Sequence, residues 1–150
     1  ARVDFEPRSA LAVQLASVAM PYPYVWRGAS QRIETVEVGG LPLGQRLGRR
    51  PRAEHILLAP DDSLIFVSDG LVERLNTRHE PWGFDAVEKA ITELGSRGIL
   101  TPAALCNALL AACDQWADGL EADDDMTVLV VQARDLRRAT TPRDAATPMR

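Results

Sequence analysis

The sequence predicts an α+β fold in which a layered β-sandwich is flanked by helices. Short apolar runs bounded by turn residues fill the first 67 residues, and two segments with helical periodicity follow between residues 84 and 119. A last apolar run at 127–131 returns the chain to the sheet. The 150 residues, of which 46% are hydrophobic and 25% charged, suit one domain with a buried core.

Six strands are expected in the first 67 residues, with a break in regular structure between residues 39 and 54. Turn residues at 6–9 and at Gly28-Ala29-Ser30 each separate two apolar runs, which predicts two hairpins. The turn Pro60-Asp61-Asp62-Ser63 separates two further short strands. The predicted strands are 1–5, 11–18, 24–27, 33–38, 55–58 and 64–67. An arginine-rich loop is expected at 45–54, and Tyr22, Tyr24 and Trp26 are interpreted as strand packing, with a peptide-contact face as the alternative.

Two helices are expected next. Val87 and Ile91 recur at helical spacing before a stop at Gly95, and Thr101-Pro102 is a helix start signal. The near-continuous apolar run at 127–131 predicts a central buried strand. Residues 1–135 are therefore expected to form the domain, and residues 136–150, rich in Arg, Thr, Pro and Ala, a disordered tail.

Charge, apolar runs and cysteine spacing argue against several classes of protein. The formal net charge of −4 and the absence of a basic stripe argue against nucleic-acid binding. No apolar stretch has the length of a membrane span, and the first residues do not resemble a signal peptide. Cys106 and Cys113 lie two helical turns apart, too far for a disulfide between them, so buried reduced thiols and a cytoplasmic location are expected.

Two acidic segments follow or precede apolar strands. Asp69 comes directly after the strand at 64–67, with Gly70 allowing a sharp turn, and Asp123, Asp124 and Asp125 precede the strand at 127–131. If the two segments converge, their oxygens would suit Mg²⁺ or Mn²⁺ rather than zinc. Each segment alone is also compatible with an ordinary turn or a solvated loop, so the residues themselves leave both interpretations open.

Five ordered motifs carry a resemblance to SpoIIE-type phosphatases, bacterial members of the phosphatase 2C-like, metal-dependent serine/threonine phosphatase (PPM) family. The run LLAPDDSLIFVSDGLVE at 57–73 resembles the family's Pro-Gly-Asp and Ser-Asp-Gly segment, and DDMTVLVV at 124–131 resembles its closing motif. The other similar segments are 17–27, 40–44 and 82–84.

The resemblance implies an enzyme and a site. Asp69 and Asp124 match the family's metal ligands, with Asp123 as the alternative if the register shifts, and Gly70, Glu73 and Asp125 are candidates for supporting roles. The implied cofactor is a dinuclear Mn²⁺ or Mg²⁺ centre. The implied substrate is a phosphorylated anti-sigma-factor antagonist, a signalling protein dephosphorylated at serine or threonine, and the chain could be the output domain of a larger sensor.

The sequence also departs from the family pattern. The Gly-Asp-x-x-Asp and Asp-Gly-x-Gly-His segments of the family's first half are missing, so the chain is expected to be the C-terminal portion of the domain and inactive alone. Ala19, Met20 and Asp61 stand where glycine, histidine and glycine are usual. These departures favour a second hypothesis, a degenerate non-catalytic binding module. A third is a homo-oligomer formed through unpaired sheet edges.

Overall fold

The computed structural model describes residues 2–5, 10–40, 53–99 and 101–134, and the side chains from residue 10 onward within these ranges. The elements in chain order are β1 (Arg2–Phe5), β2 (Leu11–Leu15), β3 (Tyr24–Arg27), β4 (Arg32–Thr35), β5 (Glu54–Leu58), β6 (Ser63–Val67), α1 (Asp69–Val72), α2 (Phe84–Ser96), α3 (Pro102–Ala117) and β7 (Val128–Gln132). None of the described helices has the length and hydropathy of a membrane span.

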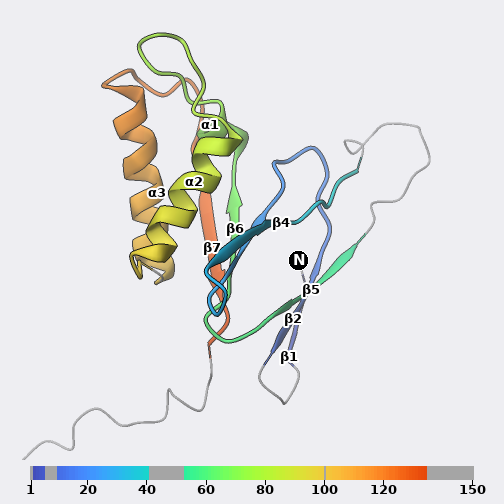
Figure 1. Cartoon of the computed structure of the whole chain (residues 1–150). Helices are drawn as coiled ribbons and strands as arrows, with labels where there is room; N and C mark the ends of the chain where they lie inside the picture. Colours follow the sequence, from blue (N-terminus) through green and yellow to red (C-terminus); the bar gives the residue numbers. More distant parts are fainter. Residues whose placement is uncertain (1, 6–9, 41–52, 100, 135–150) are drawn as a thin grey trace, which may run out of the picture.

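The strands form two antiparallel sheets. One sheet has the order β1-β2-β5 and the other the order β4-β3-β6-β7. Helices α2 and α3 lie together against one face of the four-stranded sheet, and the three-stranded sheet lies on the other side of the molecule (Figure 1). The result is the predicted α+β architecture, a β-sandwich covered by helices on one side.

Alternation along the strands of the four-stranded sheet separates two cores. Tyr24 and Trp26 of β3 face the helices, whereas Val25 between them packs with residues of β2 and β5. The same alternation places Ile65 of β6 toward the helices and Leu64 toward the other sheet. Both faces of β3 and β6 are therefore buried, which explains why their sequences are almost continuously apolar.

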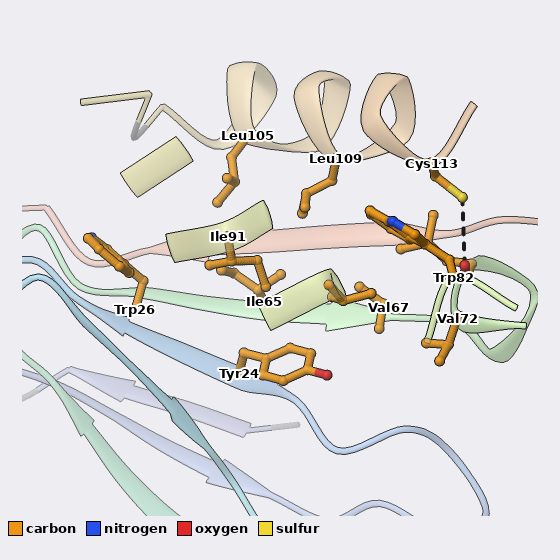
Figure 2. Close-up of a cluster of buried hydrophobic side chains, with 12 residues drawn as sticks. Tyr24, Trp26, Ile65, Val67, Val72, Trp82, Ile91, Leu105, Leu109 and Cys113 are labelled. Atoms are coloured by element: carbon orange, nitrogen blue, oxygen red, sulfur yellow. Dashed lines mark hydrogen bonds between the residues drawn. The ribbon is translucent and has the colours of Figure 1, made fainter. Parts of the chain in front are cut away.

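Helix α3 covers the sheet with one apolar face. Leu105, Leu109 and Cys113 project from successive turns toward β6, where Ile65 lies beneath them (Figure 2). The helix begins as predicted, because the Thr101 side chain accepts a hydrogen bond of 3.3 Å from the backbone N–H of Ala104.

One prediction about a single strand is wrong, and two features of the fold were not predicted. The strand at 127–131 is not central: β7 has one paired neighbour, β6, within the described strands, and Leu129 is 53% exposed. Its apolar residues reflect contact with α3 on one face rather than pairing along both edges. β5 and β6, adjacent in sequence, pair in different sheets, and the short helix α1 was not predicted. The hairpins and both longer helices are confirmed, but α2 does not stop at Gly95: it continues to Ser96, and Gly95 lies inside the helix against Trp26.

Three predicted segments lie wholly or mostly outside the described residues: the arginine-rich loop at 45–54, the family-like segment at 40–44 and the tail at 136–150. Cys106 and Cys113 are both free thiols, as predicted, but only Cys113 is buried, whereas Cys106 is half-buried.

Candidate metal centre

The two acidic segments meet at one end of the four-stranded sheet. β6 and β7 run antiparallel with Val67 opposite Val128, so the residues that follow β6 lie beside the residues that precede β7. Asp69 begins α1, with only Ser68 between it and β6, and Asp124 lies in the loop before β7. The convergence that the sequence left open is therefore present.

Gly70 shows how closely the two segments approach. A Cβ atom added at Gly70 would lie 2.5 Å from the backbone oxygen of Asp125 and 3.4 Å from the Cβ of Asp124. The Gly70 backbone conformation is one that any residue can adopt, so the close approach is what requires glycine here. Glycine thus allows helix α1 to pack against the acidic loop.

Two side chains that sequence reasoning overlooked hold this arrangement. The Ser68 hydroxyl accepts a hydrogen bond of 2.9 Å from the Thr127 N–H and donates one of 3.2 Å to the Asp125 oxygen. Arg74, only 7% exposed, donates its guanidinium N–H groups to the backbone oxygens of Leu120 and Glu121. Both residues connect the segment carrying Asp69 to the loop carrying Asp124.

The signal for Ser68 was present in the Ser-Asp-Gly motif, because a hydroxyl beside a glycine turn can bond a neighbouring backbone. Arg74 had no such signal. An arginine two residues after the end of a short helix is normally exposed, and the burial of Arg74 depends on where the end of α3 lies.

The carboxylates of Asp69 and Asp124 have the chemistry of a hard-cation site. Asp69 Oδ1 accepts a hydrogen bond of 3.1 Å from the Gly70 N–H, and Asp124 Oδ1 accepts one of 2.7 Å from the Asp125 N–H. Asp69 and Asp124 are both exposed, and the second carboxylate oxygen of each has no protein partner among the described residues. Two such oxygens fit Mg²⁺ or Mn²⁺. Within the described part of the chain, however, no group of three or more acidic, histidine or cysteine side chains could hold an ion.

Two hollows adjoin the converging segments. Asp69 lines a groove of about 720 Å³, and Asp123 and Asp124 line a smaller hollow of about 340 Å³. Glu73 lines both, and Gly70 lines the smaller one. The structure therefore brings together Asp69, Gly70, Glu73 and the loop 123–125, but the two proposed ligands face different hollows.

Strained backbone occurs at two of the three positions that depart from the family pattern. Ala19 has a φ of 53° and Asp61 a φ of 70°, both in the left-handed region that favours glycine. Asp61 lies in the turn before β6, where the neighbouring Asp62 carboxylate accepts hydrogen bonds from Arg27, Gly28 and Ala59. The glycines expected from the resemblance thus correspond to a real conformational requirement.

Comparison with known proteins identifies the family. The family model described as "Stage II sporulation protein E (SpoIIE)" matches residues 3–134. The chain belongs to the SpoIIE family. No curated protein is significantly similar to it in sequence.

Several solved structures share the fold of this SpoIIE-family chain. The phosphatase domain of SpoIIE from Bacillus subtilis, in a crystal form without domain swapping, matches with a TM-score of 0.61 and 22% identity, over 94% of this chain and 56% of that one. The SiaA-PP2C domain of Pseudomonas aeruginosa matches with a TM-score of 0.62 and 18% identity, over 83% of this chain and 46% of that one. The RsbU and RsbW domains of a Mycobacterium tuberculosis protein match with a TM-score of 0.64 and 23% identity, over 85% of this chain and 33% of that one.

These likenesses establish the fold as phosphatase 2C-like. The chain spans about half the length of the first solved structures that it matches, between 46% and 59% of each.

Proposed function

We propose that this chain is the C-terminal portion, residues 1–135, of a metal-dependent phosphoserine/phosphothreonine protein phosphatase domain, followed by a tail at 136–150. The observation that carries the proposal is the packing of Gly70 against Asp124 and Asp125. This contact brings Asp69 and Asp124 to the same end of the β6–β7 pair. The membership of the SpoIIE family and the PP2C-like fold support the reaction class.

Asp69 and Asp124 would hold one side of a dinuclear Mn²⁺ or Mg²⁺ centre, with Asp123 as the alternative ligand and Glu73 and Asp125 in support. When bound, such ions supply positive charge to the phosphoryl group and lower the pKa of the attacking water. The chain's own residues orient the carboxylates: Ser68 and Arg74 fix the loop before β7 relative to α1. The Gly-Asp-x-x-Asp and Asp-Gly-x-Gly-His segments that would supply the further ligands are missing from this sequence, so this chain alone should be inactive.

We propose further that the substrate is a phosphorylated anti-sigma-factor antagonist and that the protein acts in the cytoplasm as the output domain of a larger sensor. This part rests on the resemblance to SpoIIE-type phosphatases. One of the matching structures contains RsbU and RsbW domains in a single chain.

The test uses the longer protein that the proposal requires, in which the first half of the phosphatase domain precedes Ala1. We expect Mn²⁺-dependent hydrolysis of p-nitrophenyl phosphate that falls on the order of 100-fold or more in Asp69→Ala and in Asp124→Ala. The matched control is Asp114→Ala, because Asp114 is an exposed carboxylate of α3 that lines neither hollow. Unchanged activity in the Asp69 and Asp124 variants would show that the ligands are assigned wrongly.

A second candidate, a non-catalytic phosphatase-fold binding module, has one observation in its favour. Met20, which stands where the family usually has histidine, is 50% exposed in the groove that Asp69 lines. A longer protein that carries the missing acidic segments, folds, and shows no Mn²⁺-dependent hydrolysis would favour this candidate over the enzyme. β7 leaves one edge unpaired within the described strands, so such a module could associate with a second copy.

A further inference from the structure

Exposed apolar side chains gather in the groove beside Asp69. The described residues include five large hydrophobic side chains that are strongly exposed, and three of them line this groove: Met20 at 50%, Tyr22 at 45% and Phe84 at 52%. Scattered single exposures are normal, whereas several in one concave surface mark a contact site. The groove has a volume of about 720 Å³, large enough for several side chains of a peptide.

The groove is also acidic. Asp69, Glu73 and Glu88 line it, and no lysine, arginine or histidine does so among the described residues. The pKa of Tyr24, whose side chain also lines the groove, is raised to about 12, first by burial and then by the charges of Glu88 and Asp85. The local potential is therefore negative, which favours cationic partners.

Two of the lining side chains, Glu88 and Tyr22, have contacts that orient them. Thr35 Oγ1 donates a hydrogen bond of 3.0 Å to Glu88 Oε1, which fixes one acidic side of the groove. The ring of Tyr22 lies against Gly39, where an added Cβ atom would be 3.4 Å from the ring. Ala19, at the groove's edge, has the left-handed φ of 53° that is commonly retained at functional sites.

We propose that this groove binds the extended segment that flanks the phosphorylated residue of the partner protein, and that this segment carries apolar side chains next to lysine or arginine. The inference rests on the proposed function, because the groove leads to Asp69, the candidate metal ligand. A phosphorylated residue at the metal centre would bring its flanking residues over Tyr22, Phe84 and Glu88. The exposed aromatic rings would cover the apolar side chains, and Glu73 and Glu88 would attract the cations.

The experiment measures peptide binding by fluorescence anisotropy, first with this chain and then with the longer protein. The first probe is a fluorescein-labelled peptide in which leucine and phenylalanine alternate with two arginines beside a serine. An acidic peptide replaces the arginines with glutamate, and a polar peptide replaces leucine and phenylalanine with serine. We expect the first probe to bind about tenfold or more tightly than either of the others.

Matched variants locate the binding. Phe84→Ser should weaken binding of the first probe about tenfold and Glu88→Gln about threefold. Leu57→Ser removes an apolar side chain that is 63% exposed outside the groove, and Asp114→Asn removes an exposed helical carboxylate; each should change binding less than about twofold. Equal binding of the three peptides, no binding of the first, or equal losses in the controls would overturn the proposal.

The same measurements separate this inference from the proposed function. If the longer protein hydrolyses p-nitrophenyl phosphate but shows no peptide preference, the docking inference alone fails. If peptide preference is present and Mn²⁺-dependent hydrolysis is absent, the groove remains a binding site and the phosphatase proposal fails. Selective binding by this chain that disappears in the longer protein would show that the rest of the domain covers the groove, and would also overturn the inference.

Discussion

Gly70→Ala is the substitution that most sharply perturbs the candidate centre. The added methyl carbon would lie 2.5 Å from the Asp125 oxygen and 3.2 Å from its carbonyl carbon. To relieve this overlap, α1 and the loop before β7 must move apart by roughly 0.9 Å, until the added carbon and the Asp125 oxygen reach an ordinary contact distance of about 3.4 Å. Overpacking of this kind costs about 1–3 kcal/mol, while the helix propensity of alanine returns up to about 1 kcal/mol. We expect a net destabilisation of about 1–2 kcal/mol.

Urea unfolding followed by circular dichroism measures this change, and NMR amide shifts locate it. The urea concentration at the unfolding midpoint should fall, with little change in the dependence of the unfolding free energy on urea concentration. The largest amide chemical-shift changes should occur at residues 123–127. Gly39→Ala is the control, because a Cβ there would meet only the Tyr22 ring at 3.4 Å or beyond. If Gly70→Ala is as stable as the Gly39 variant and leaves the 123–127 amides unshifted, the two acidic segments do not abut and the reasoning fails.

Three further substitutions or measurements test other parts of the account. Asp61→Gly should raise the free energy of unfolding by about 0.5–1 kcal/mol in urea titrations, because glycine relieves the φ of 70°; a loss of stability would contradict this. Arg74→Met should lower the free energy of unfolding by about 1.5–3 kcal/mol, because the backbone oxygens of Leu120 and Glu121 lose charged donors. An unchanged unfolding midpoint would contradict this prediction. With an aromatic disulfide reagent at pH 8, Cys106 should react before the buried Cys113, whose pKa is raised to about 11 by burial. The rate at which Cys113 reacts should rise as the pH approaches its pKa of about 11. Equal reaction rates of Cys106 and Cys113 at pH 8 would contradict the burial of Cys113.

Local features of the site followed directly from the sequence. Asp69 and Gly70 come after a strand whose residues are almost all apolar, so a turn with a fixed carboxylate could be predicted there. The start of α3 at Thr101 and Pro102 was equally local. Such features depend on residues within one or two turns of each other, which is the range over which periodicity and capping operate.

Long-range pairing could not be predicted in the same way. The contact of Gly70 with Asp125 depends on β6 pairing with β7 across more than fifty residues, and an apolar run does not specify its neighbour. The error over β7 has the same origin, since its apolar residues indicate covered faces but not paired edges. The burial of Arg74 likewise depends on where α3 ends, which the residues around Arg74 do not encode.

Paramagnetic broadening of backbone amides by Mn²⁺ tests the central claim most directly. The claim is that Asp69 and Asp124 form one side of a metal centre, so Mn²⁺ should bind this chain weakly, in the high-micromolar range or above. Titration should broaden the amides of both acidic segments, 69–70 and 123–125, in parallel, and Asp69→Asn should reduce the broadening at both. Broadening confined to one segment, or centred on other carboxylates such as Glu93, would contradict the account.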